Sequence, residues 1–145
     1  MNTQPFLIDT NVFVAFFTQE TTGNFYACKK LFESLEREGY PFILHALVIV
    51  ELIWVLHAKL KFSKKQVLQA VDRCSSLSGC STDYSFDIDW ANALFNKHST
   101  KYIDCCLASI PEIQQGEWKL ISYDKDFEKL KIKRWTPESV IFSLD

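Results

Sequence analysis

The sequence is poor in glycine, proline and net charge, and each shortage narrows what the chain can be. Only four glycines and four prolines occur in 145 residues, which leaves little room for long flexible linkers. We therefore expect one domain that spans residues 1–145. The net charge of −2 argues against a surface coated for non-specific nucleic-acid binding, because such proteins present a strongly basic face. Local basic clusters at 29–30, 59–65 and 125–134, taken singly, fit solvated helix faces or loops.

The chain also lacks the cysteine and histidine motifs of disulfide-rich, zinc-binding and thiol-dependent proteins. Its five cysteines are odd in number, show no C-x-x-C spacing and follow no signal peptide, which argues against a disulfide framework or a zinc site. We expect reduced core thiols in a cytoplasmic protein. His45, His57 and His98 stand in no pairing motif, so we interpret them as structural or surface residues and expect no cysteine–histidine catalytic pair.

No hydrophobic run is long enough to cross a membrane. The most apolar stretch, 42–56, is shorter than the roughly 20 residues that span a bilayer, and His45 and Glu51 interrupt it. A buried strand followed by a central helix, apolar nearly all round, fits this stretch better. No membrane association is expected.

Short apolar segments alternate with segments of helical period along the chain. Strands are expected at 5–8, 41–44, 118–122 and 132–135, and the Ser- and Gly-rich stretch 75–85 has room for another. Helices are expected at 10–20, 24–38, 46–60, 63–74, 87–98, 99–110 and 126–130, with a tail at 136–145. This alternation is typical of an α/β protein in which helices cover both faces of a parallel sheet.

Four acidic residues lie inside apolar segments that are far apart in the sequence. They are Asp9 in PFLIDTN, Glu51 in LVIVELIWVL, Asp104 in KYIDCCLAS and Asp124 in KLISYDKDF. A buried carboxylate must be paired, hydrogen-bonded, bound to a metal or protonated, because burial removes the water that solvates its charge. Asp9 and Asp124 follow predicted strands, and α/β proteins bind ligands at the carboxyl ends of parallel strands. Convergence of the four acids would create a site for a divalent cation.

Three of these acids also have ordinary structural explanations. Asp9 could cap the helix that follows it, and Asp104 falls in the first turn of a helix, where the helix dipole favours an acid. Asp124 sits in a turn between a strand and a helix, where aspartate is common, and the neighbouring Asp126 could cap that short helix.

Glu51 has no such local explanation. It lies in the middle of a predicted helix, and its neighbours three and four positions away are leucine, valine and tryptophan. If Glu51 is buried, something positive must face it. This could be a lysine, arginine or histidine side chain, or a metal that Glu51 shares with Asp9 and Asp104.

The type of ligand sets the chemistry of such a site. Carboxylates without histidine or cysteine are hard oxygen donors, which suit Mg²⁺ or Mn²⁺ better than zinc. A cation held in this way can orient a phosphate, generate hydroxide and stabilise a leaving oxygen, while a carboxylate serves as general base. An acidic metal centre beside basic clusters is the charge arrangement needed to cut a phosphodiester.

The segments FLIDTN, VIVELIWVL, YIDCCLAS and LISYDKDF, in this order and spacing, resemble the PIN-domain ribonucleases, and most of all the VapC-type toxins of prokaryotic toxin–antitoxin pairs. The resemblance covers nearly the whole chain. It implies a three-layer α/β/α domain with a central parallel sheet, and endonucleolytic cleavage of RNA that depends on Mg²⁺ or Mn²⁺. It also implies a homodimer and a cognate antitoxin protein that blocks the site.

The resemblance also implies roles for individual residues. Asp9, Glu51 and Asp104 would form the core acidic triad, Asp124 or Asp126 would be the fourth acid, and Asn11 and Ser122 would orient ligands or water. The departures from the family pattern are modest. Ser122 stands where threonine is common, and two cysteines follow Asp104 where small residues are usual, so no carboxylate is lost.

The resulting interpretation is a metal-dependent endoribonuclease toxin. We expect Asp9, Glu51 and Asp104 to lie within a few ångströms of one another around a cation. One alternative is an aspartate-based phosphatase or phosphoacceptor domain with Asp9 as nucleophile, although Asn11 stands where such enzymes have a second aspartate. The other is a non-catalytic interaction module whose acids are structural.

Overall fold

A computed structural model describes residues 4–19 and 23–144 of the chain, and its centre is a parallel β-sheet. The five described strands are β1 (Phe6–Ile8), β2 (Phe42–His45), β3 (Cys80–Asp83), β4 (Lys119–Ile121) and β5 (Arg134–Trp135). They lie in the order β3-β2-β1-β4-β5, and every neighbouring pair is parallel. The expected strands are thus confirmed, including one within the Ser- and Gly-rich stretch.

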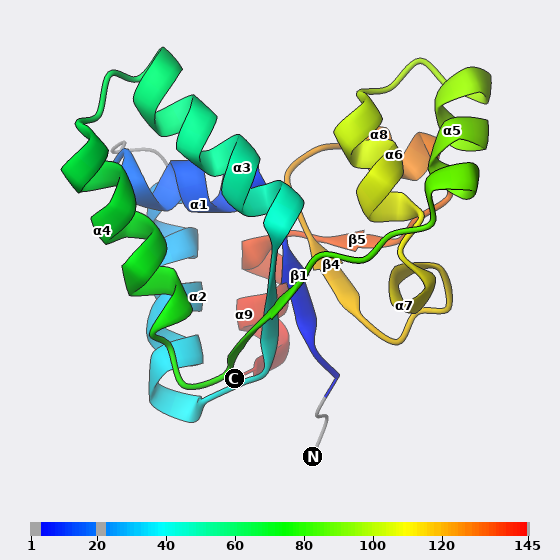
Figure 1. Ribbon diagram of the computed structural model, residues 1–145. Coiled ribbons are helices and arrows are strands. Elements are labelled where there is room, and N and C mark those ends of the chain that lie inside the picture. Colours follow the sequence, from blue (N-terminus) through cyan, green and yellow to red (C-terminus); the bar gives the residue numbers. More distant parts are fainter. Residues whose placement is uncertain (1–3, 20–22, 145) are drawn as a thin grey trace.

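Helices cover both faces of this sheet. The described helices are α1 (Thr10–Phe17), α2 (Gly23–Glu38), α3 (Ala46–Trp54), α4 (Lys64–Ser75), α5 (Ile88–Lys97), α6 (Tyr102–Ala108), α7 (Pro111–Gln114), α8 (Asp126–Lys129) and α9 (Pro137–Leu144). Figure 1 shows α1, α2, α4 and α9 on one side of the sheet and α5 to α8 on the other. The predicted three-layer α/β/α architecture is confirmed. No described helix is both long and apolar enough to span a membrane.

The strands β1 and β2 are buried along their whole length. Both lie inside the sheet, so each face meets a helical layer, and this explains their continuous apolar sequences FLI and FILH. The buried polar exception is His45, which caps α3: its Nδ1 accepts a hydrogen bond from the Leu47 amide at 3.2 Å. The structural interpretation of this histidine is confirmed. The cysteines are all free, as expected, and Cys80 alone among them is not buried.

The path of the chain creates a topological switch point between β1 and β4. After β1 the chain adds β2 and β3 on one side, and then crosses to add β4 and β5 on the other. Ligands bind at such a switch point, outside the carboxyl ends of the strands. Ile8 pairs with Ile121, so the residues that follow, Asp9 and Ser122, leave the sheet side by side.

Local capping hydrogen bonds fix the start of α4 and the end of α2. Ser63 begins α4 with a capping box: its Oγ accepts from the Gln66 amide at 3.1 Å, and the Gln66 side chain accepts from the Ser63 amide at 2.8 Å. Gly39 ends α2 with a φ of 65°, a left-handed conformation that favours glycine, and donates to the Leu35 carbonyl at 2.9 Å.

The helix predicted over 99–110 is confirmed by the shorter α6, and a second helix, α7, follows where none was predicted. α6 ends at Ala108, and Pro111 begins α7. The proline disfavours the helical conformation in Ile110, which is extended, and then provides a suitable first residue for α7. The helix predicted over 10–20 ends at Phe17, and residue 20 lies outside the described residues.

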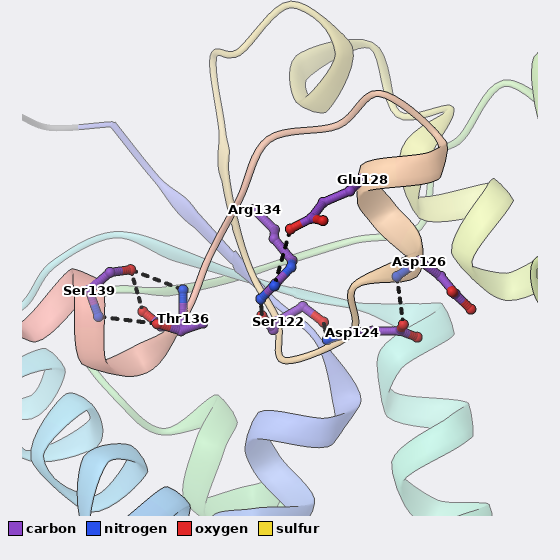
Figure 2. Close-up of polar contacts among 7 residues, drawn as sticks. All are labelled: Ser122, Asp124, Asp126, Glu128, Arg134, Thr136 and Ser139. Carbon is purple, nitrogen blue, oxygen red and sulfur yellow. Dashed lines mark hydrogen bonds and ion pairs between the residues drawn. The ribbon is translucent and has the colours of Figure 1, made fainter.

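The predicted tail at 136–145 is also wrong, because α9 occupies most of it. Pro137 is the first residue of this helix. Thr136 and Ser139 each use a side-chain oxygen to accept the other's amide hydrogen, at 3.3 and 3.0 Å, as Figure 2 shows. The buried Val140 contributes to the core, and α9 packs against α2. Thr136 and Pro137 were the start signals that the prediction overlooked.

The helix predicted over 46–60 changes character near its middle. α3 ends at Trp54, and a π-helical segment follows over Val55–Lys59. The expectation of a central helix that is buried all round is wrong, because Val50 is 67% exposed and Trp54 is 54% exposed. The apolar sequence predicted burial on every side, whereas α3 buries only the face that contains residues such as Leu52.

Candidate metal centre

Asp9 stands at the carboxyl end of β1 and is the N-cap of α1. One carboxylate oxygen, Oδ1, accepts from the Thr10 amide at 2.8 Å. The other, Oδ2, accepts from Ser122 Oγ at 2.7 Å and from Asn11 Nδ2 at 3.2 Å. Asp9 is 4% exposed, so these donors replace the water that burial removes. Its position and orientation are therefore fixed by the protein.

Ser122 is the centre of the hydrogen-bond network that joins β1 to β4. Its Oγ accepts from Asn11 Nδ2 at 3.1 Å and from the Asp124 amide at 3.0 Å, while it donates to Asp9. Asn11 Oδ1 also accepts from the Tyr123 amide at 3.1 Å. The two residues predicted to orient ligands thus contact Asp9 directly and tie it to the turn that contains Asp124.

A more open group of acids lies beside this network. Among the described residues, Asp104, Asp124 and Asp126 each offer a carboxylate oxygen within 4.8 Å of the others. Figure 2 shows Asp124 in the turn before α8 and Asp126 at the first residue of that helix, where the Asp124 side chain accepts from the Asp126 amide at 2.9 Å. Asp104 reaches the group from α6, on a different part of the chain.

Asp104 lacks the hydrogen bonds that Asp9 has. It is 2% exposed, and its Oδ2 is buried without a hydrogen-bond partner. A buried carboxylate oxygen without a donor is unfavourable, and two further carboxylates beside it add repulsion. A divalent cation would relieve both problems. The donor set of three carboxylates is also the oxygen-only chemistry that Mg²⁺ and Mn²⁺ prefer, so these residues fit such an ion.

The acids repel one another and are poorly solvated, which raises the pKa of two of them. Burial raises the pKa of Asp104 to about 8, with further contributions from Asp9 and Asp124. Burial also raises the pKa of Asp9 to about 6, although the hydrogen bonds from Ser122 and Thr10 lower it. Without a counter-ion, Asp104 is therefore largely protonated at neutral pH.

Lys101 provides a cation that the sequence interpretation missed. It is the N-cap residue of α6. Burial lowers its pKa, but attraction to Asp104, Glu51, Asp124 and Asp9 raises it further, so that the net change is upward. Its position three residues before Asp104 was the available signal, since such spacing places two side chains on one face of a helix.

Glu51 lies on α3 and is only half-buried, so it needs no direct partner. Its charge interacts with Asp9 and Lys101, which places it on the border of the centre. Among the described residues, neither Glu51 nor Asp9 belongs to the compact group that Asp104 forms. Their participation in binding a cation stays a prediction.

The structure brings Asp124 and Asp126 together with Asp104, where the sequence left open which of the two would take part. Asp126 does not cap α8, because the N-cap is Lys125; it forms an ion pair with Lys129 at 3.1 Å instead. Nearby, Arg134 donates to the Ser122 carbonyl and to Glu128, both at 3.2 Å, as Figure 2 shows.

Comparison with known proteins gives a consistent result. The sequence model of the PIN domain matches residues 6–133. A VapC ribonuclease from Aquifex aeolicus (strain VF5) is 24% identical over 131 residues, which cover 90% of this chain and 96% of that protein.

Two solved structures share the fold. PAE2754 from Pyrobaculum aerophilum superimposes with a TM-score of 0.68 at 13% identity, over 98% of this chain and 96% of that one. VapC20 from Mycobacterium tuberculosis, a sarcin–ricin loop cleaving toxin, gives 0.65 at 12% identity, over 90% of this chain and 98% of that one.

Proposed function

The chain belongs to the PIN domain family, and from this premise we propose that it is a divalent-metal-dependent endoribonuclease, the toxin of a toxin–antitoxin pair. One observation carries the proposal. The buried Asp104 oxygen without a partner lies in a group of three carboxylates, two of which follow β4 at the β1–β4 switch point, the place where α/β proteins bind ligands. Similarity to a VapC ribonuclease supports RNA as the substrate.

Asp104, Asp124 and Asp126 would hold the cation, with Asp9 and Glu51 beside them. When bound, Mg²⁺ or Mn²⁺ stabilises the charge that develops on the phosphate and lowers the pKa of water. Glu51 is partly exposed and lies outside the compact group of Asp104, Asp124 and Asp126, which suits it to accept a proton from an attacking water.

Asn11 and Ser122 act on Asp9 and not on the substrate. Their hydrogen bonds occupy its Oδ2 and hold the carboxylate in one orientation. Lys101 offsets part of the negative charge of the centre, so a phosphate of the RNA backbone meets less repulsion as it approaches.

The structure offers no feature that favours Asp9 as the nucleophile of a phosphatase. Both of its carboxylate oxygens already accept hydrogen bonds, and the residue is buried. A nucleophile needs an oxygen that the phosphorus can reach. The other alternative, a non-catalytic interaction module, predicts that neither Mg²⁺ nor Mn²⁺ stabilises the protein against heat.

We also propose two protein partners for this single nuclease domain. A cavity of about 320 Å³ between α1, α2 and α4 is lined by four phenylalanines of α1 and α2 and by charged side chains, among them Glu33 and Arg73, and it suits an antitoxin segment that carries both apolar and charged side chains. A homodimer would cover part of the exposed apolar surface, which on α5 includes residue 88 at 57% exposure. Both partners, like the proposed cytoplasmic location, fit the toxin role.

A cleavage assay tests the central proposal. End-labelled RNA is incubated with the protein and Mg²⁺, Mn²⁺ or EDTA, and Asp9→Asn and Asp104→Asn are compared with Asp72→Asn, an exposed acid on α4. We expect both site variants to lose cleavage by roughly a hundred-fold or more, the scale of several kcal/mol of lost charge stabilisation. Asp72→Asn should retain it. Undiminished metal-dependent cleavage by both site variants would contradict the assignment.

A further inference from the structure

Trp54 is an exposed aromatic residue at the edge of the proposed nuclease site. It lies three residues after Glu51 in α3, within one helical turn. Its side chain is 54% exposed, and Val50 in the preceding turn is 67% exposed. Large apolar surface that stays in water beside a functional site is typical of a binding surface.

The π-helical segment places a cation over this ring. The Leu60 amide donates to the Val55 carbonyl at 3.0 Å, a hydrogen bond that spans five residues. In a regular α-helix, residues five apart point about 140° away from each other, since each residue turns about 100°. The wider turn brings them onto one face, and Lys59 Nζ lies 4.7 Å from the centre of the Trp54 ring.

The charged side chains in the segment around Trp54 and Lys59 are all positive. Residues 52–71 contain four lysines and no aspartate or glutamate. Lys64 and Lys65 even occupy the first turn of α4, where the helix dipole favours acids and disfavours cations. This arrangement complements a polyanion, and its first residue directly follows the partly exposed Glu51 along the chain.

We propose that Trp54 and Lys59 form a nucleobase-stacking subsite that holds an unpaired base of the RNA next to the cleavage site. The inference rests on the proposed ribonuclease function. Single-stranded nucleic acids bind to aromatic rings flanked by cations, because every base has a face that can stack. The flexible lysine stem lets the ammonium move from the ring to the adjacent phosphate when a base takes its place.

The test measures RNA binding separately from cleavage. Binding of a fluorescein-labelled, single-stranded oligoribonucleotide of mixed sequence is followed by anisotropy at several salt concentrations, in the Asp104→Asn background to prevent cleavage. Trp54→Ala should weaken binding about five- to a hundred-fold and leave the salt dependence unchanged. Trp54→Phe should retain most of the affinity, because a ring remains.

Lys59→Ala distinguishes the phosphate contact from the stacking contact. Loss of one phosphate contact should reduce the slope of log affinity against log salt by about 0.7, the value for single strands. The control is Tyr84→Ala, which removes an 81% exposed aromatic residue after β3 and should change neither quantity. Thermal melting of each variant checks that the fold is retained.

Each other outcome has a definite meaning. Unchanged binding by Trp54→Ala, or no binding by the parent, overturns the subsite. A change in mass by sedimentation equilibrium without a change in RNA binding also overturns it, and assigns Trp54 to an interface between copies. If RNA binds through Trp54 but the wild-type protein cleaves no RNA with either metal, the ribonuclease proposal fails and the subsite stands.

Discussion

Asp9 and Asp104 are both buried, but they differ in the hydrogen bonds that their carboxylate oxygens accept. Asp9 is 4% exposed and receives hydrogen bonds on both carboxylate oxygens, whereas Asp104 is 2% exposed and has an oxygen with no partner. The pKa of Asp9 is raised to about 6, and that of Asp104 to about 8. Burial alone therefore does not distinguish a positioned carboxylate from one available to a cation. The number of hydrogen-bond donors around the carboxylate distinguishes the two cases.

Substitution of Asp104 and of Asp9 should differ most in its effect on metal affinity. We expect Asp104→Asn to lower the affinity for Mn²⁺ about a hundred-fold, because it removes a carboxylate of the compact group. Asp9→Asn should lower it only about ten-fold, the scale of a residue that supports the ligands. Isothermal titration measures both, with Asp72→Asn as control. Equal losses in the two site variants would mean that Asp9 binds the ion as directly as Asp104 does.

The pH dependence of stability should show the same difference. The pKa of each of these acids in the folded state lies above its ordinary value of 3.8, so the folded state binds more protons than the unfolded state. The contribution of these two groups to the stability of the metal-free protein should therefore be greatest below about pH 4. It should fall by on the order of a few kcal/mol as the pH rises to about 8.

Urea unfolding in EDTA at pH 5, 6.5 and 8 measures this trend. Saturating Mg²⁺ should reduce the loss at the alkaline end, because the ion binds the deprotonated carboxylates. Asp104→Asn should flatten the trend between pH 6.5 and 8, where Asp9 is mostly ionised. Stability that rises with pH over this range in both proteins would show that these carboxylates are not the groups that dominate.

Ser122→Ala tests the hydrogen-bonded side of the comparison. It removes the donor to Asp9 Oδ2 and the acceptor for Asn11 and the Asp124 amide, so we expect a loss of about 2 kcal/mol in the free energy of unfolding. Ser122→Thr retains the hydroxyl and is the matched control. A full retention of stability by Ser122→Ala would mean that water replaces the hydroxyl.

The smallest effect should come from Lys101. Lys101→Met removes the cation that faces the acids, so Mn²⁺ should bind about two- to ten-fold more tightly while RNA binds more weakly, an order of magnitude at most for one near-surface charge. Lys97→Met, at an exposed position on α5, is the control. Weaker binding of both Mn²⁺ and RNA would show that Lys101 supports the centre structurally.

Much of the fold could be predicted because local rules agree with it. The apolar runs FLI and FILH became the buried strands β1 and β2, and the local signals at Ser63 and Gly39 mark where α4 begins and where α2 ends. The start of α9 was missed although local signals mark it, whereas the predicted burial of α3 failed because neighbouring elements decide it. The burial of α3 depends on which of its faces other elements cover, and its apolar sequence does not indicate which faces these are.

The sequence by itself determined the parallel α/β architecture and the set of acids, because alternating apolar segments and carboxylates at strand ends are local features. Only the tertiary structure decided which of those acids form the compact group and which lie beside it. The register of Ile8 with Ile121 brings Ser122 to Asp9, and the packing of α6 against α8 accompanies the approach of Asp104 to Asp124 and Asp126. Distances between residues far apart in sequence depend on long-range packing, and the pKa of each acid depends on those distances.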